Sequence, residues 1–335
     1  MKVLLYTEGL KTFSKSGLGK AIEHQMKALK EVKVPYTLDV NDNYDIVHLN
    51  MYLLKSYYLA KSKKKAGKKI VYHAHSTEED FKNSFIFSNQ IAPFFKKWII
   101  KCYSLGDYII TPTPYSKKLL ESYGIKKPIV AISNGIELSF FKRTKELEME
   151  SSSFRKKYGF KSNDKVIMGI GLYLERKGIL DFVELAKRLP EYKFIWFGFT
   201  PLYTVPKKIR KAVRTDLPNL TFAGYVPQED IKKAMASFDL YLFPTLEETE
   251  GIPILEACAM KIPAIIRDIK VFDEWLVDSK NVYKAKDIND FEIKIKSYLN
   301  NELKDLTEEG YKVAKEHDIK IIGKKLKQVY EEVLK

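Results

Sequence analysis

The stretch Thr245-Leu-Glu-Glu-Thr-Glu-Gly-Ile-Pro-Ile-Leu-Glu-Ala-Cys-Ala259 places acidic residues, a glycine and a proline directly after an apolar run. That run, Phe238-Asp-Leu-Tyr-Leu-Phe-Pro244, is typical of a buried parallel strand. Pro253 stands where a helix has its first turn, and residues 254–260 have helix-forming side chains. The stretch therefore predicts a strand, an acidic turn and a helix N-terminus, whose backbone N–H groups face ligands in α/β proteins.

The acidic residues of this stretch allow two interpretations. Glu248 lies in the turn and Glu256 lies one turn into the helix, so both side chains can face the same crevice. Alternatively, the glutamates of the turn are solvated surface charges. Whether these glutamates form a binding site or a charged surface depends on the motifs in the rest of the chain.

Length and composition are those of a globular protein with two domains. The chain has 335 residues, of which 45% are apolar and 30% are charged. Its two cysteines, Cys102 and Cys258, have no metal-ligand spacing and favour a reducing compartment over a disulfide framework or a zinc site. No apolar run approaches the length of a membrane span, and residues 1–6 are typical of a first strand rather than of a signal peptide.

The net charge of +15 is unevenly distributed, since residues 1–150 carry 25 Lys and Arg against 15 Asp and Glu. Such a surplus favours an anionic partner, which can be nucleic acid, an anionic bilayer or a phosphorylated substrate. Lysine-rich codon usage would give the same surplus, so the charge alone does not identify an anionic partner. A nucleic-acid-binding protein would show a clustered basic face or a known module, and the sequence shows neither, so we expect no nucleic-acid partner.

Strand-like and helix-like segments alternate along the chain, which predicts an α/β fold with two doubly wound parallel sheets. The alternation breaks between about residues 140 and 163, a polar and charged region that we interpret as the inter-domain region. We therefore expect domains at 1–145 and 146–315, and a C-terminal helix at 316–335 that packs back on the first domain. The predicted strands are 3–6, 45–49, 69–73, 108–111 and 129–133, then 165–171, 193–197, 220–224, 238–244 and 264–267.

Two glycine turns stand near the starts of the two domains. Ser16-Gly-Leu-Gly19 follows the first strand and a polar loop, and it opens a helix. Gly169-Ile-Gly171 ends the first strand of the second domain, and the pair Arg176-Lys177 follows it. Glycines let backbone N–H groups approach a phosphate, and paired cations suit a diphosphate. The alternatives are a tight loop and a solvated basic turn.

His73-Ala-His75 ends a predicted strand. We expect the two side chains to point to opposite faces, which would make them poor ligands for one metal ion. One of them then faces the crevice at the carboxyl ends of the strands, where active sites gather; the alternative is a structural histidine. The segments 108–116 and 132–137 are further strand ends that would face this crevice.

In this order and spacing, the motifs resemble those of the retaining glycosyltransferases of family 4, over nearly the whole chain. This family has two Rossmann-like domains facing a central cleft, the GT-B fold, which we therefore expect here. The motifs that carry the resemblance are Gly17-Leu-Gly19, His75, Ser133-Asn-Gly-Ile136, Gly171 with Lys177-Gly178, Gly224-Tyr225, and Glu248 and Glu256 with Gly251 and Pro253 between them.

The resemblance implies a role for each of these positions. Family members use sugar nucleotides, generally without an essential metal, so we expect a UDP-hexose substrate and no cofactor; the chain has no Asp-x-Asp motif. Glu256 would bind the ribose, Glu248 would lie near the transferred sugar, Lys177 would hold the diphosphate and His75 would hydrogen-bond the sugar. The implied catalytic residues are His75 and Glu248, and the implied donor-binding residues are Gly17, Gly19, Gly171, Arg176, Lys177, Tyr225, Glu250, Gly251, Ile252 and Glu256.

The chain departs from the family pattern at two positions. Leu172 stands where the family usually has arginine, and Arg176 is a candidate for the missing cation. Glu250 adds a carboxylate near the expected sugar position, so the donor sugar stays open between glucose and galactose.

Residues 81–101 interleave aromatic and aliphatic side chains with lysines. This pattern is typical of a segment that lies in a bilayer interface and is attracted to anionic lipid. The alternative is an ordinary helix that packs against the sheet. The residues predicted to contact the membrane or the acceptor are Phe85, Phe87, Phe94, Phe95, Lys96, Lys97, Trp98 and Lys101.

Residues 75–85 and 111–117, together with the Glu248 turn, are similar to those of bacterial glycolipid synthases of this family. Those enzymes add a second hexose to monoglucosyldiacylglycerol, giving a diglycosyl diacylglycerol. The similarity implies a cytoplasmic protein that is peripheral on the inner face of the cell membrane. Alternatives are a soluble or polysaccharide acceptor, or a sugar-nucleotide-binding protein in which Leu172 has abolished catalysis. The oligomeric state and the linkage position stay open.

Overall fold

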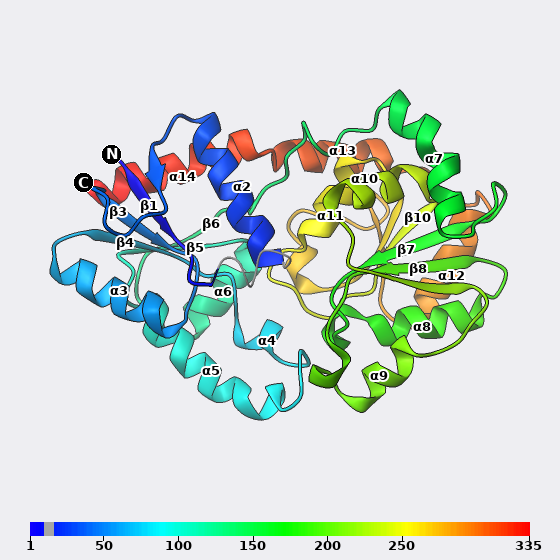
Figure 1. Ribbon diagram of the computed structural model, residues 1–335, viewed down its shortest axis with the longest axis horizontal. Coiled ribbons are helices and arrows are strands. Elements are labelled where there is room, and N and C mark those ends of the chain that lie inside the picture. Colours follow the sequence, from blue (N-terminus) through cyan, green and yellow to red (C-terminus); the bar gives the residue numbers. More distant parts are fainter. Residues whose placement is uncertain (10–16) are drawn as a thin grey trace. The chain divides into compact units, whose positions relative to one another are not determined.

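The computed structural model describes residues 1–9 and 17–335, which divide into two compact units (Figure 1). The chain crosses between the units several times, so neither unit is one continuous segment. The first unit contains Met1–Phe81, Asn89–Glu137 and Glu316–Lys335, and the second contains Lys82–Ser88 and Leu138–Lys315. Thus the C-terminal segment belongs to the first unit, and the short segment 82–88 belongs to the second.

The first unit is built on a six-stranded parallel sheet with the strand order β2-β1-β3-β4-β5-β6. The chain order reverses at β1, whose neighbours are β2 and β3, and such a reversal marks the usual ligand crevice of a doubly wound sheet. The strands are β1 Val3–Tyr6, β2 Tyr36–Thr37, β3 Ile46–Leu49, β4 Lys69–His73, β5 Tyr108–Thr111 and β6 Ile129–Ala131.

Alternate residues of these strands enter two cores on opposite faces of the sheet. Leu4 packs with Tyr57 and Ile99 on one face, whereas Val3 packs with Leu29 and Leu326 on the other. Helices α3 and α5 supply the first core, and α2 and α14 supply the second; Figure 1 shows α14 beside α2. The helices are α2 Gly17–Glu31, α3 Leu54–Lys65, α4 Glu78–Phe81, α5 Ser88–Tyr103, α6 Pro114–Ser122 and α14 Ile319–Leu334.

The second unit has a six-stranded parallel sheet with the order β12-β11-β10-β7-β8-β9. Here the chain order reverses at β7, whose neighbours are β8 and β10. The strands are β7 Val166–Ile170, β8 Lys193–Phe197, β9 Leu220–Gly224, β10 Leu240–Phe243, β11 Ala264–Arg267 and β12 Tyr283–Ala285. The helices are α7 Lys145–Lys157, η1 Glu175–Lys177, α8 Ile179–Arg188, η2 Leu202–Thr204, α9 Lys207–Val213, α10 Gln228–Ser237, α11 Ile252–Ala259, η3 Lys270–Phe272, α12 Ile288–Leu299 and α13 Thr307–Glu316.

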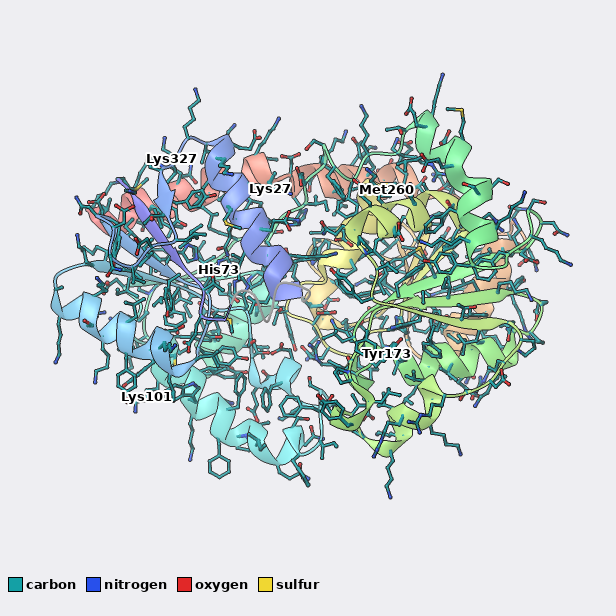
Figure 2. All side chains as sticks on the ribbon, in the orientation of Figure 1. Lys27, His73, Lys101, Tyr173, Met260 and Lys327 are labelled. Carbon is teal, nitrogen blue, oxygen red and sulfur yellow. The ribbon has the colours of Figure 1, made fainter. Side chains whose placement is uncertain are left out.

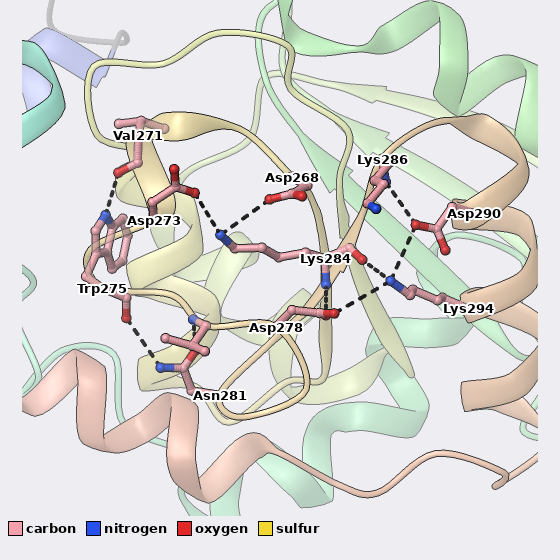
Figure 3. A network of polar contacts seen from close by, with 11 residues as sticks. Asp268, Val271, Asp273, Trp275, Asp278, Asn281, Lys284, Lys286, Asp290 and Lys294 are labelled. Atoms are coloured by element: carbon pink, nitrogen blue, oxygen red, sulfur yellow. Dashed lines mark hydrogen bonds and ion pairs between the residues drawn. The ribbon is translucent and has the colours of Figure 1, made fainter.

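A charged network holds the edge strand β12 to the loop after β11 (Figure 3). The Lys284 side chain is 8% exposed, and its Nζ lies 3.3 Å from Asp273 Oδ1 and 3.5 Å from Asp268 Oδ1. Its backbone N–H donates to Asp278 Oδ1 at 2.7 Å, and Lys294 Nζ lies 4.0 Å from Asp278 Oδ2. A buried cation needs such balancing carboxylates, so we assign this network a structural role.

The α/β class and the two parallel sheets predicted from the sequence are confirmed. The structure adds α7 in the stretch interpreted as the inter-domain region. Thr144 caps α7 by accepting a hydrogen bond from the Leu147 backbone N–H, and acidic residues at its start and basic residues at its end favour the helix locally. Its apolar periodicity is weak because Leu147 and Phe154 are its only buried apolar side chains. Within residues 1–9 and 17–335, no helix is long and apolar enough to cross a bilayer.

Candidate active site

The turns after the neighbouring strands β7 and β10 contain the predicted donor-binding residues of the second unit. Lys177 lies in η1 on the β7 side, and Glu248 lies in the acidic turn after β10. The two side chains form a close ion pair, with 15% and 9% of their surfaces exposed. The structure therefore brings together the residue expected to hold the diphosphate and the residue expected to lie near the sugar.

Gly178 explains why these two turns approach each other so closely. Its φ of +73° is a left-handed conformation that favours glycine, and it ends η1 directly after Lys177. A Cβ at this position would lie 2.1 Å from the carbonyl oxygen of Pro244, the residue that follows β10. The absence of a side chain at Gly178 thus permits the contact that seats Lys177 beside the acidic turn.

Two of the three glutamates in the acidic turn, Glu248 and Glu250, are buried, so their interpretation as solvated surface charges is wrong. Glu248 is 7% exposed and Glu250 is 2% exposed. Gly251 stands at the N-cap of α11 with φ +95°, and α11 starts at Ile252. Glu256, one turn further, is fully buried. These carboxylates lie around the start of a helix that follows β10, a neighbour of β7 where the strand order reverses, which is the place where α/β proteins bind ligands.

Tyr241 is a candidate site residue that the sequence reasoning missed. It lies on β10, and its hydroxyl is buried with no hydrogen-bond partner among the residues that the structure describes. Burial and the nearby carboxylates of Glu256 and Glu248 raise the pKa of Tyr241 well above its ordinary value. The phenol is therefore a neutral group close to both glutamates. Its signal in the sequence was a tyrosine in a strand that is otherwise apolar.

The departure at Leu172 has a local explanation in packing, because this side chain packs against the core of the second unit. Arg176, the candidate for the missing cation, donates from Nε to Ser84 Oγ at 2.9 Å and from a terminal nitrogen to the Glu247 carbonyl at 3.4 Å. Its guanidinium thus joins the segment 82–88 to the acidic turn, within the second unit.

The remaining predicted donor-binding residues also follow strand ends. Gly171 comes directly after β7, donates to the Phe197 carbonyl at 2.9 Å and accepts from Trp196 Nε1 at 2.8 Å. Tyr225 follows β9 and is 50% exposed. In the first unit, Gly17 and Gly19 form the first turn of α2, whereas Ser16 and most of the preceding loop lie outside the described residues.

The expectation that His73 and His75 point to opposite faces is wrong. Their rings stack with centroids 4.1 Å apart and an interplanar angle of 6°. The reason is the period of two in an extended chain, which places residues i and i+2 on the same face. His73 ends β4 (Figure 2), and His75 follows in the crevice region, where its Nε2 lies 3.0 Å from Asn50 Oδ1.

Burial lowers the pKa of His75 to about 3. The imidazole is therefore neutral near pH 7, with one nitrogen that donates and one that accepts a hydrogen bond. Such a ring can bind and orient a sugar hydroxyl, and it adds no positive charge to the site.

The predicted membrane residues fall into two groups. Phe85, Phe87 and Phe94 are 40%, 67% and 72% exposed, and Lys97 and Lys101 are also exposed. Ile86 and Ile91 add to this set at 37% and 45% exposure. Exposed aromatic and aliphatic side chains next to lysines are the features of a surface that enters a bilayer interface.

The other three predicted membrane residues are engaged within the first unit. Phe95 is 8% exposed and stacks on Phe81, so its assignment to a membrane surface is wrong: the inward face of α5 packs against the sheet. Trp98 is partly buried and donates from Nε1 to the Tyr52 carbonyl at 2.6 Å. Lys96 pairs with Glu78 at 3.1 Å. One face of α5 therefore packs in the core of the first unit, and the opposite face is exposed.

Among residues 1–9 and 17–335, no three His, Cys, Asp or Glu side chains gather in a way that could hold a metal ion. The second unit offers a buried Lys–Glu pair, two further buried glutamates and a helix N-terminus. The first unit offers a neutral histidine.

The fold matches that of solved glycosyltransferases with two Rossmann-like domains, the GT-B class. Anabaena HepE in complex with UDP-glucose superposes with a TM-score of 0.77 over 99% of this chain and 100% of that chain, at 16% identity. The sucrose-phosphate synthase of Thermosynechococcus elongatus superposes with a TM-score of 0.80 over 100% and 99% of the two chains, at 13% identity. At these identities the likeness shows the fold alone.

The sequence comparisons give the family. The model for glycosyl transferases group 1 matches residues 150–316, and the model for Glycosyltransferase Family 4 matches residues 26–140. The processive diacylglycerol alpha-glucosyltransferase of Acholeplasma laidlawii is 42% identical over 100% of this chain and 99% of that protein. The alpha-galactosylglucosyldiacylglycerol synthase of Streptococcus pneumoniae is 25% identical over 82% of this chain and 73% of that protein. The chain belongs to glycosyltransferase family 4, and it is an enzyme of the transferase class.

Proposed function

We propose that this enzyme transfers a hexose, glucose or galactose, from a UDP-sugar to a membrane glycolipid, with retention of the anomeric configuration. The acceptor that we favour is monoglucosyldiacylglycerol, and the product is then a diglycosyl diacylglycerol. The observation that carries the proposal is the 42% identity along the whole chain to an enzyme named as a diacylglycerol alpha-glucosyltransferase. That name favours glucose as the sugar and adds diacylglycerol itself as an acceptor to test.

The second unit has the groups that a departing nucleoside diphosphate needs. Lys177 supplies a cation, and the N-terminus of α11 supplies backbone N–H groups at Gly251 and Ile252. In this proposal the diphosphate binds Lys177, and Glu256 binds the ribose hydroxyls. Glu248, paired with Lys177 in this structure, lies near the transferred sugar. Fixed charges of this kind act most strongly on the charge that develops in the transition state.

The first unit and the segment 82–88 have features that suit a lipid acceptor. Phe87 is 67% exposed and has φ +66°, a backbone conformation that is uncommon for a bulky residue. Phe94 is 72% exposed on α5, four residues before the partly buried Trp98. We propose that these aromatic side chains enter the acyl–headgroup boundary, with Lys97 and Lys101 near anionic headgroups. The cytoplasmic leaflet is the anionic one, so we place the enzyme as a peripheral protein on the inner face of the cell membrane.

The test is a transfer assay with purified protein and vesicles of phosphatidylglycerol and neutral lipid. Radiolabelled UDP-glucose and UDP-galactose are supplied in parallel, each with diacylglycerol, monoglucosyldiacylglycerol or a soluble glucoside as acceptor. We expect label in a new lipid that extracts into chloroform and depends on monoglucosyldiacylglycerol. Label in the soluble glucoside alone would overturn the proposed acceptor. Label in no acceptor, with the sugar nucleotide intact, would overturn the proposed reaction.

A further inference from the structure

A continuous chain of polar side chains connects His75 to the C-terminal helix inside the first unit. Its members are Gln25 of α2, His48 of β3, Asn50, His73 of β4, His75 and Tyr330 of α14, which we call the histidine network. All of them except His75 are at most 2% exposed. Positions 46, 48 and 50, and positions 71, 73 and 75, alternate with positions whose side chains enter the core beside α3 and α5, so they face α2 and α14 on the other side of the sheet.

With the amides of Gln25 and Asn50 oriented as they are in the structure, the contacts assign a donor and an acceptor to each hydrogen bond of the network. Gln25 Nε2 is a donor, and it lies 2.9 Å from Asn50 Oδ1 and 2.8 Å from His73 Nδ1. His73 Nδ1 is therefore an acceptor. His48 Nε2 lies 3.3 Å from the same His73 nitrogen, so it has to donate. His75 Nε2 lies 3.0 Å from Asn50 Oδ1, which is an acceptor, so this nitrogen also carries a hydrogen.

Each ring carries one hydrogen only. Burial lowers the pKa of His48 and of His75 to about 3, and burial together with the neighbouring histidines lowers the pKa of His73 well below its ordinary value. A neutral imidazole that donates from Nε2 has a bare Nδ1. In His75 this bare Nδ1 is the nitrogen left for a substrate.

Tyr330 determines which atom donates and which accepts in each hydrogen bond of the network. Turning over the amides of both Gln25 and Asn50 would give a second arrangement, in which every hydrogen bond is reversed and His75 carries its hydrogen on Nδ1. In that arrangement the Tyr330 hydroxyl would lose its acceptor, because His48 Nδ1, at 2.6 Å, is the only partner of this fully buried hydroxyl among the described residues. The hydroxyl oxygen would still accept from His48 Nδ1, but its own O–H would have no acceptor, and a buried donor without a partner costs about 1–3 kcal/mol. The phenol therefore favours the arrangement with His48 Nδ1 as acceptor.

We propose that Tyr330 and Asn50 are positioning residues, which hold His75 as the tautomer with its hydrogen on Nε2 and leave Nδ1 to accept a hydrogen bond from a substrate hydroxyl. The nature of that hydroxyl, on the hexose or on its acceptor, rests on the proposed function; the tautomer does not. Thus the C-terminal helix, far from His75 in the sequence, contributes to the site through hydrogen bonds.

Unsatisfied atoms around Asn50 support a ligand at this place. Asn50 Nδ2, Gln25 Oε1 and His73 Nε2 are buried and have no hydrogen-bond partner within residues 1–9 and 17–335. One hydroxyl of a ligand can donate to His75 Nδ1 while a different hydroxyl accepts from Asn50 Nδ2, which lies on the Nε2 side of the ring. Sugars offer hydroxyls that donate and accept in this way.

The direct test is nitrogen NMR of protein labelled with ¹⁵N in its five histidines. Imidazole ¹⁵N shifts distinguish the two tautomers, and single histidine substitutions assign the signals. At pH 7 we expect His48, His73 and His75 to be neutral with the hydrogen on Nε2. A His75 signal with the hydrogen on Nδ1, or a charged His75, would overturn the proposal. The spectrum needs no sugar nucleotide and no lipid, so it decides this proposal even if the proposed transfer reaction fails.

The variant Tyr330→Phe keeps the ring and removes only the donor that sets the direction. We expect a mixture of His75 tautomers and a kcat lowered by about three- to tenfold, the worth of one hydrogen bond, with an unchanged KM for UDP-glucose. Tyr44→Phe is the matched control, since Tyr44 is 2% exposed in the same unit and donates to the Val40 carbonyl at 3.0 Å. If Tyr330→Phe leaves the His75 tautomer unchanged, or if Tyr44→Phe alters it equally, Tyr330 has no positioning role.

Discussion

Lys177 and Glu248 balance each other's charge in a largely buried position, and in the proposed reaction the diphosphate takes over as the partner of the lysine. Lys177→Ala removes the cation that would stabilise the leaving group. We predict a fall in kcat of about 10²-fold or more, the usual cost of losing a group that stabilises transition-state charge. Lys208→Ala is the control, because Lys208 pairs with Glu175 at 2.5 Å on the exposed surface of the same unit. Turnover near the wild-type rate in Lys177→Ala would remove this lysine from the mechanism.

Gly178 offers a separate test of how the two turns are held together. Gly178→Ala places a Cβ 2.1 Å from the Pro244 carbonyl oxygen, so η1 or the end of β10 has to move. Gly159→Ala is matched in backbone strain, with φ +78°, but its Cβ would meet no atom within 4 Å. We predict that Gly178→Ala lowers the thermal midpoint by several degrees more than Gly159→Ala does, and that it also weakens UDP binding measured by calorimetry. Equal midpoints for the two variants would show that the close approach of Gly178 to Pro244 does not stabilise the fold.

The aromatic segment from Phe85 to Phe94 combines a turn and the start of α5, and its exposed side chains can be changed without altering a core. Phe87→Asn keeps a residue that tolerates a positive φ, and Phe94→Gln keeps a good helix former. Together they should lower binding to phosphatidylglycerol vesicles by at least about tenfold, because each phenylalanine contributes about 1.5–3 kcal/mol when fully buried.

Co-sedimentation measures this binding, and Ile293→Gln is the control, since Ile293 is 63% exposed on α12. The account of the aromatic segment fails if the double variant and the control bind vesicles equally well.

The elements that could be predicted from the sequence are those with strong local signals. Strands β4, β8, β9 and β11 have the predicted bounds, because each is a largely apolar run between polar residues or turns. The short edge strands β2 and β12 were not predicted, since two or three residues carry too little periodicity. Likewise, the burial of Phe95 depends on which face of α5 meets the sheet, and that is set by tertiary packing.

Site residues that belong to a sequence motif could be predicted. Site residues that are brought together only by tertiary packing could not. The turns with Lys177 and Glu248 could be found from their residues, and the structure adds that the two side chains pair. The role of Tyr241 could not be found, because a tyrosine in a buried strand usually has only a packing role. The histidine network needed contacts such as Tyr330 to His48, which join residues 282 positions apart.

The chain as a whole carries a net charge of +15, so the proposed membrane association should have an electrostatic component. Raising the salt concentration from 0.1 M to 1 M shortens the Debye length from about 10 Å to about 3 Å. We predict that binding to phosphatidylglycerol vesicles then falls by at least about tenfold, whereas binding to neutral vesicles is weak and changes little. Co-sedimentation over this salt range provides the measurement, and binding that is equally strong at both salt concentrations would contradict an electrostatic contribution.

The most direct test of the central claim is the structure of the product that the wild-type enzyme makes from UDP-glucose and monoglucosyldiacylglycerol. Proton NMR of the purified lipid gives the configuration of the newly formed glycosidic bond. A retaining transferase that acts on a glycolipid has to give a diglucosyl diacylglycerol in which the added glucose is α-linked, as it is in the donor. A β-linked product, or the absence of a diglucosyl lipid under conditions in which the enzyme transfers glucose to a soluble acceptor, would contradict the account.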